Sequence, residues 1–166
     1  TLRPETIFGV TNLWVNPQTT YNKITVDGEK WIVSAECAHK LEFLDKEVSY
    51  DGEISGAELV GKDVEIPHRG ESIPMLEASF VESGTGTGLV MSVPAHAPFD
   101  YQALADLKKK GHELASKTEP ISIISTEGYG EFSAQEACEK FGVKDQDDPK
   151  LEEATAEIYG KEFYGG

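Results

Sequence analysis

The stretch GTGTGLVMSVPAHAPFD, residues 84–100, organises the prediction of the fold. Glycines alternate with threonines at its start, an apolar run follows over residues 89–93, and prolines stand at positions 94 and 98. Glycine permits backbone conformations and close approaches that other residues resist, and proline cannot donate to a sheet ladder. The pattern therefore predicts a buried central strand over residues 89–93, and then a loop that presents Asp100 beside His96.

On the N-terminal side of this stretch, short strands separated by turns are expected. Asp27-Gly28 lies between two segments expected to be strands, Tyr21–Val26 and Glu29–Val33, and predicts a tight hairpin. Pro4 and Gly9 delimit one helical turn, and Ser34 is suited to cap a helix over Ala35–Phe43. Further strands are predicted over Val10–Val15, Glu47–Tyr50, Asp63–Ile66 and Ile73–Val81, with turns at Asp51-Gly52 and Arg69-Gly70. Many short strands closed by glycine turns are typical of a barrel or a sandwich.

On the C-terminal side, helices predominate. Pro98 suits a first helical position, and the apolar stripe that follows predicts a helix over Phe99–Lys110 that ends at Gly111. A strand is expected over Ile121–Ser125. A capping box over Ser133–Glu136 predicts a helix that stops at Gly142. The last predicted helix begins at Asp148-Pro149, ends at Gly160 and turns Leu151, Ala154 and Ile158 inward.

Length and charge limit the functions that this chain can have alone. The 166 residues fit one domain with a sizeable core. Fifteen basic residues against thirty acidic ones give a net charge of −15, which argues against a general grip on nucleic acid. Such a domain can still receive one flexible single-stranded end if other domains supply the affinity. Because the chain starts at Thr1 inside a motif, we expect it to be a piece of a longer protein.

The composition also predicts the compartment. No apolar run approaches the roughly 20 residues that a spanning helix needs, and no signal peptide is seen, so a soluble protein without membrane contact is expected. Cys37 and Cys138 form no Cys-x-x-Cys pair. We expect both to be buried free thiols in a reducing, cytoplasmic setting.

Several kinds of site are disfavoured by the spacing of the residues. The glycines at 84, 86 and 88 satisfy neither the dinucleotide nor the P-loop fingerprint. His96 and Asp100 lack the third ligand of a catalytic zinc site, so no metal is predicted. Ser92 stands in mid-strand without the G-x-S-x-G elbow, which disfavours a covalent serine mechanism.

Two segments carry a resemblance to a known family. The opening TLRPET, residues 1–6, and GTGLVMSVPAHAPFD, residues 86–100, resemble the two signature regions of the editing domain of leucyl-tRNA synthetase, archaeal and eukaryotic type, in the class I aminoacyl-tRNA synthetase family. The related valyl and isoleucyl enzymes have similar runs. The Arg-Pro-Glu-Thr continuation and the Val-Pro-x-His-x-x-x-Asp spacing favour the leucyl member. The resemblance implies an α+β, β-rich fold over residues 1–166, a twisted β-barrel core with several peripheral helices.

The resemblance also implies an activity, the proofreading hydrolysis of wrong amino acids from tRNA during protein biosynthesis. Asp100 would hold the α-ammonium group of the esterified amino acid, and Thr6 would line the pocket and limit side-chain size. Polar groups of Thr1 and Arg3 would face the terminal adenosine and the scissile ester. The remaining substrate-binding residues implied are Gly86, Thr87, Gly88, Val93 and His96. Leu2 replaces the second threonine of the bacterial form, so no hydroxyl is expected there.

The implied partners are the 3′ end of tRNA(Leu) carrying a wrong amino acid and the remaining domains of the parent synthetase. Editing would need no cofactor, and ATP would serve only the absent synthetic domain. From the residues alone, purely structural roles for two of these residues stay open. Asp100 at a third helical position would complement the helix dipole, and Thr6 would have only a local role. A non-catalytic module that docks a tRNA end or a neighbouring domain is the alternative function, and a related isoleucyl or valyl editing domain is the alternative family.

Overall fold

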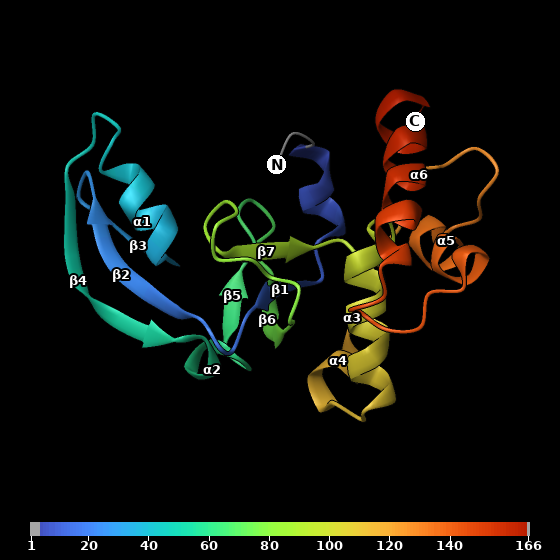
Figure 1. The fold of residues 1–166 in the computed structure, drawn as a ribbon, viewed down its shortest axis with the longest axis horizontal. Coiled ribbons are helices and arrows are strands. Elements are labelled where there is room, and N and C mark those ends of the chain that lie inside the picture. Colours follow the sequence, from blue (N-terminus) through green and yellow to red (C-terminus); the bar gives the residue numbers. More distant parts are fainter. Residues whose placement is uncertain (1–3, 166) are drawn as a thin grey trace. The chain divides into compact units, whose positions relative to one another are not determined.

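The computed structural model describes residues 4–165, with side chains described through residue 163, and these residues form two compact units (Figure 1). The first unit takes in Thr1–Asn12, Asp63–Pro74 and Met91–Gly166, of which the described part is discussed below. The second unit takes in Leu13–Lys62 and Met75–Val90. Each unit is therefore assembled from segments that are separate in the sequence.

Both helices and strands are present, which confirms the mixed class. The strands are β1 Asn12–Val15, β2 Thr20–Val26, β3 Glu29–Ser34, β4 Val48–Ser55, β5 Asp63–Glu65, β6 Ser72–Glu77 and β7 Leu89–Ser92. The helices are the 3₁₀ helix η1 Pro4–Gly9, then α1 Ala35–Leu41, α2 Gly56–Leu59, α3 Pro98–Lys109, α4 Glu113–Lys117, α5 Ser133–Phe141 and α6 Lys150–Gly165. The strands that the structure describes form two sheets, with orders β5-β6-β1-β7 and β3-β2-β4, rather than the closed barrel that was expected.

The predicted hairpin is present in the second unit. β2 and β3 pair antiparallel up to Val26 and Glu29, and Asp27 and Gly28 both have positive φ, 49° and 89°. Two consecutive positive φ values match the twist of the flanking strands. The predicted N-cap is confirmed as well, since the Oγ of Ser34 accepts a hydrogen bond from the amide of Cys37 at 3.1 Å. Helix α1 ends at Leu41 and buries Ala38 against the hairpin (Figure 1).

The turn predicted at Asp51-Gly52 is wrong, because β4 continues through these residues. Gly52 pairs with Lys23 and Tyr50 pairs with Ile24, so Asp51 is one extra residue in the ladder. This is a β-bulge, for which glycine inside a strand is a common mark. The hydroxyl of Thr25 donates to the Asp51 carboxylate at 2.6 Å across the bulge.

The glycine-rich segment is attached to the hairpin through its backbone. The amide of Ser34 donates to the carbonyl of Thr87 at 2.8 Å, and the buried phenol of Tyr21 donates to the carbonyl of Gly88 at 2.9 Å. Gly88 has a φ of 76°, and an added Cβ would lie 2.7 Å from the Cβ of Ser34. Only glycine fits there, both sterically and conformationally.

Replacing this glycine is expected to destabilise the fold. Gly88→Ala should lower the free energy of unfolding by about 2 to 4 kcal/mol, because left-handed strain and a clash with Ser34 add together. Urea unfolding of the chain measures the change. Gly84→Ala is the matched control, since Gly84 has no positive φ and no atom within 4 Å of its added Cβ. Equal stability of the two variants would contradict the packing described for Gly88.

The expectation of a buried central strand over residues 89–93 is wrong. β7 stands at the end of the strand order, its first two residues are half-buried, and Met91 is 40% exposed. β6 and β1 occupy the interior positions, where Trp14, Val15 and Leu76 are fully buried. β1 and β6 pair in parallel, a long-range pairing that local apolar content does not reveal.

The helices of the first unit follow most of the predicted boundaries. Pro98 starts α3 at its first position, and Gly111 and Gly142 follow α3 and α5 with positive φ. The stop predicted at Gly160 is wrong, because α6 continues past it. The predicted inward stripe of α6, Leu151, Ala154 and Ile158, is buried. Helices α2 and α4 were not predicted.

The two cysteines are free, and the structure describes no helix of the length and apolarity that crossing a membrane requires. Cys138 is buried as expected, whereas Cys37 is only half-buried. Burial raises the pKa of the Cys138 thiol to about 12, so this thiol stays protonated.

Candidate active site

The predicted site residues fall in different places. Thr6, Val93, His96 and Asp100 belong to the first unit. The glycine run at residues 86–88 belongs to the second unit, where Gly86 and Thr87 are exposed and Gly88 is buried. Thr1 and Arg3 lie outside the described residues.

Thr6 is half-buried on η1, a helix whose carbonyl groups are held by one arginine. The Nη1 of Arg69 donates to the carbonyls of Phe8 and Val10, each at 3.2 Å, and more weakly to that of Ile7 at 3.4 Å. Such charge-assisted hydrogen bonds are stronger than neutral ones. The element that carries Thr6 is therefore fixed in place. The sequence showed Arg69 only as part of a turn, so it carried no signal of this function.

Asp100 closes the loop that precedes its own helix. Its Oδ2 accepts a hydrogen bond from the backbone amide of Val93 at 2.7 Å, and the residue is only 6% exposed. The carbonyl of Val93 in turn accepts from the amides of His96 and Ala97, both at 3.0 Å. Asp100 occupies the third position of α3, as predicted, where the positive end of the helix favours a carboxylate. The chain thus fixes the direction of this carboxylate.

Residues 7–11, which directly follow the first signature region, meet the second signature region in the first unit although the two are far apart in the sequence. The amide of Thr11 donates to the carbonyl of Ser92 at 3.1 Å. Val10 and Val93 share one buried apolar cluster, with Ile7 packed against it. At Gly9 an added Cβ would lie 3.1 Å from the Cγ1 of Val93, so the end of η1 presses directly on the loop that leads to Asp100.

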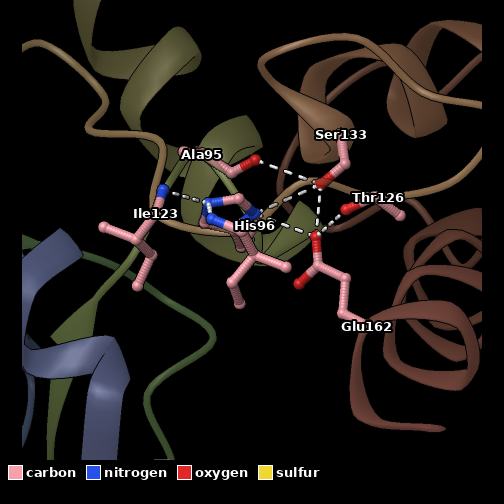
Figure 2. A network of polar contacts seen from close by, with 7 residues as sticks. Ala95, His96, Ile123, Thr126, Ser133 and Glu162 are labelled. Atoms are coloured by element: carbon pink, nitrogen blue, oxygen red, sulfur yellow. Dashed lines mark hydrogen bonds and ion pairs between the residues drawn. The ribbon is translucent and has the colours of Figure 1, made fainter. Parts of the chain in front are cut away.

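His96 is buried in a polar network rather than turned toward solvent (Figure 2). The network joins His96 to Thr126, Ser133 at the start of α5, and Glu162 on α6, and we call these four residues the His96 cluster. The Oε1 of Glu162 accepts from Nδ1 of His96 at 2.9 Å, from Thr126 at 2.7 Å and from Ser133 at 2.6 Å. All four residues are almost completely buried.

The directions of the hydrogen bonds assign the protons of the ring. Nε2 of His96 faces the backbone amides of Ile123 at 2.9 Å and Ile124 at 3.3 Å, which can only donate. Nε2 therefore carries a lone pair and the proton resides on Nδ1, from which it is donated to Glu162. The imidazole is neutral and Glu162 is an anion. Both ring nitrogens of His96 are therefore hydrogen-bonded within the chain.

The His96 cluster explains two differences from the sequence predictions. The strand expected over residues 121–125 is absent, because the amides of Ile123 and Ile124 bond to an imidazole instead of a neighbouring strand. The predicted capping box at Ser133 is also absent, since its hydroxyl points to Glu162 and α5 has no side-chain cap.

Glu162 was missed because the predicted helix ended too early. With α6 continuing past residue 160, Glu162 extends the buried face of Leu151, Ala154 and Ile158. Burial opposes ionisation of this carboxyl, but hydrogen bonds from His96, Ser133 and Thr126 outweigh it and lower its pKa. A glutamate at an inward position of an apolar stripe is the sequence signal by which Glu162 could have been found.

Other chemistries find little support in the geometry. Ser92 is fully buried in β7 and its hydroxyl has no hydrogen-bond partner in the described structure, so no base activates it. Among residues whose placement is described, no three His, Cys, Asp or Glu side chains converge in a way that could hold a metal ion. The site thus offers a carboxylate, hydroxyl groups and backbone amides.

Comparison with known proteins identifies the family. Residues 1–127 match the family described as leucyl-tRNA synthetase, editing domain, which is more than half of the chain. The chain belongs to this family. The isoleucyl and valyl alternatives are not favoured, because the similar proteins are leucine--tRNA ligases.

Archaeal leucine--tRNA ligases are among the relatives of this editing domain. The leucine--tRNA ligase of Methanothrix thermoacetophila is 53% identical over 172 residues, and that of Pyrococcus furiosus is 48% identical over 180 residues. Both alignments cover 100% of this chain but only 18% and 19% of the relative. The chain therefore spans about a fifth of the length of the curated relatives it matches, so it corresponds to one domain of a larger synthetase.

Solved structures share the fold. The crystal structure of GlLeuRS-CP1 is 33% identical, with a TM-score of 0.85 over 99% of this chain and 67% of that chain. The P. falciparum cytosolic leucyl-tRNA synthetase editing domain has a TM-score of 0.86 over 99% of this chain and 65% of its own. At 21% identity the second likeness concerns the fold alone.

Proposed function

We propose that this editing domain hydrolyses the ester of wrong amino acids attached to tRNA(Leu). The need for such a reaction is physical. A synthetic pocket separates side chains that differ by one methylene by only about 1 to 3 kcal/mol, so a second site must remove the small errors. The observation that carries the proposal is the junction in the first unit, where η1 with Thr6 packs against the loop closed by Asp100.

In the proposed reaction, Asp100 binds the α-ammonium group of the esterified amino acid and water attacks the ester carbonyl. The Val93 amide fixes the carboxylate before substrate arrives, so little orientation is lost on binding. Thr6 forms the wall that limits side-chain size. Thr1, Arg3 and the backbone of residues 86–88 complete the proposed contacts to the ester and the terminal adenosine, and the ribose hydroxyl assists the water.

The proposal extends to partners and compartment. The 3′ end of tRNA(Leu) is the proposed ligand, and the other domains of the parent enzyme supply the affinity that a charge of −15 does not. No cofactor is proposed for editing, and ATP is assigned to the synthetic domain. The free thiols at Cys37 and Cys138 suit a reducing compartment, and we propose the cytoplasm.

A deacylation assay tests the proposed function. The parent synthetase and the isolated chain are mixed separately with isoleucyl-tRNA(Leu) and with leucyl-tRNA(Leu), and release of the amino acid is followed. We expect the parent to clear isoleucyl-tRNA(Leu) and spare leucyl-tRNA(Leu), because Thr6 excludes the γ-branched side chain. Binding of both tRNAs without hydrolysis of either would indicate a docking module instead of a hydrolase.

A further inference from the structure

The His96 cluster connects three parts of the first unit to the loop that carries Asp100. His96 lies in that loop, Thr126 in the irregular segment before α5, Ser133 at the start of α5, and Glu162 on α6 (Figure 2). Residue 127 is the last that matches the family sequence. Ser133 and Glu162 therefore lie beyond the part of the chain that the family model covers.

The cluster holds the Asp100 loop at a second point, separate from the bond made by the Asp100 carboxylate. Asp100 binds the loop through the Val93 amide, and the His96 side chain binds it to α6 through Glu162. A short loop that is held at two points has few alternative conformations. The position of the Asp100 loop therefore depends on the carboxylate of Glu162, which lies near the C-terminal end of the chain.

The same imidazole also positions the Thr6 helix. Its Nε2 anchors the amides of Ile123 and Ile124, and this segment packs on the end of η1. At Gly9, an added Cβ would lie 3.2 Å from the Cδ1 of Ile123 and 3.3 Å from the carbonyl oxygen of Ile121. One ring thus links the segment that supports Thr6 to the loop that carries Asp100.

We infer that Glu162 and His96 form a positioning dyad for the editing site, in which Glu162 holds the Nδ1–H tautomer of His96 so that Nε2 can anchor the 121–124 segment. Neither residue touches the substrate in this inference, which rests on the proposed hydrolysis. The dyad sets the spacing between the ammonium anchor and the size-limiting wall. Helix α6 is then part of the catalytic apparatus although it carries no substrate contact.

The test uses the parent synthetase with Glu162→Gln, which keeps the shape of the side chain and one acceptor oxygen but removes the negative charge that strengthens the hydrogen bonds from His96, Thr126 and Ser133. We expect kcat for hydrolysis of isoleucyl-tRNA(Leu) to fall about 10- to 100-fold, because small misplacements of reacting groups are costly. KM should stay within about twofold, since the Asp100 carboxylate is still present to bind the ammonium group. Leucine activation at the synthetic site should not change.

Glu157→Gln is the matched control, because Glu157 also joins α6 to α5. Its carboxylate accepts from Lys140 Nζ at 2.6 Å and from the phenol of Tyr129 at 2.5 Å, away from His96. If α5 and α6 only had to be linked to each other, both variants would lose similar amounts of kcat. The dyad predicts that only Glu162→Gln lowers kcat. Equal values of kcat for the two variants would overturn the inference.

Two further variants test whether His96 and Glu162 act together. Ser133→Ala deletes one donor to Glu162 and should lower kcat less than Glu162→Gln does, in the same direction. His96→Gln combined with Glu162→Gln should lose no more activity than the worse single variant, because the pair acts as one unit. Additive losses would overturn the dyad and leave the proposed hydrolysis intact. A wild-type parent without hydrolysis would overturn both.

Discussion

Asp100→Ala is expected to abolish hydrolysis of mischarged tRNA(Leu) by the parent synthetase, so that this variant deacylates neither mischarged nor correctly charged tRNA(Leu). Removing one partner of a desolvated ion pair costs about 3 to 5 kcal/mol, which corresponds to at least roughly a 100-fold loss in rate. The structure shows that this variant also deprives the Val93 amide of its acceptor. A buried amide without a partner costs about 1 to 3 kcal/mol, so the alanine variant alone mixes two effects.

Asp100→Asn separates the charge from the hydrogen bond. The amide oxygen of asparagine can still accept from Val93 and keep the loop closed, while the negative charge is lost. We expect thermal unfolding of this variant to stay near that of the wild type, with hydrolysis still reduced at least about 100-fold. If Asp100→Asn hydrolyses mischarged tRNA at the normal rate, the carboxylate is a structural cap of the loop and does not anchor the ammonium group.

Thr6→Ala is expected to act in the opposite direction, by making the parent enzyme hydrolyse correctly charged leucyl-tRNA(Leu). The substitution removes a methyl and a hydroxyl from the proposed wall, so the γ-branched leucine side chain no longer collides. We expect hydrolysis of leucyl-tRNA(Leu) to rise on the order of 10- to 100-fold, the range that one missing group in a pocket commonly provides. Hydrolysis of isoleucyl-tRNA(Leu) should be retained.

Thr6→Val is the control for shape. Valine keeps the branched outline of threonine without its hydroxyl, so a steric gate should still exclude leucine. Since Arg69 holds η1 through its carbonyls, neither substitution at Thr6 disturbs the anchoring of the helix. If Thr6→Ala spares leucyl-tRNA(Leu), or if Thr6→Val admits it, the size limit is not set by the bulk of this side chain.

Features that depend on short-range chemistry could be predicted from the residues alone. The Asp27-Gly28 hairpin, the Ser34 cap, the proline start of α3 and the glycine after α5 all formed as predicted. Each follows from the backbone preferences of one or two residues, which act whatever the rest of the chain does. The family signatures at residues 1–6 and 86–100 could likewise be read from short continuous segments.

The long-range partners, in contrast, could be identified only from the folded chain. The parallel pairing of β1 with β6 displaced β7 from the interior, and the buried ring of His96 took the amides that a strand over residues 121–125 would have used. The hydroxyl of Ser133 likewise donates to Glu162 instead of forming the predicted helix cap. A buried polar group must find partners wherever the packed chain supplies them, and the segments that supply them here lie up to 66 residues apart in the sequence.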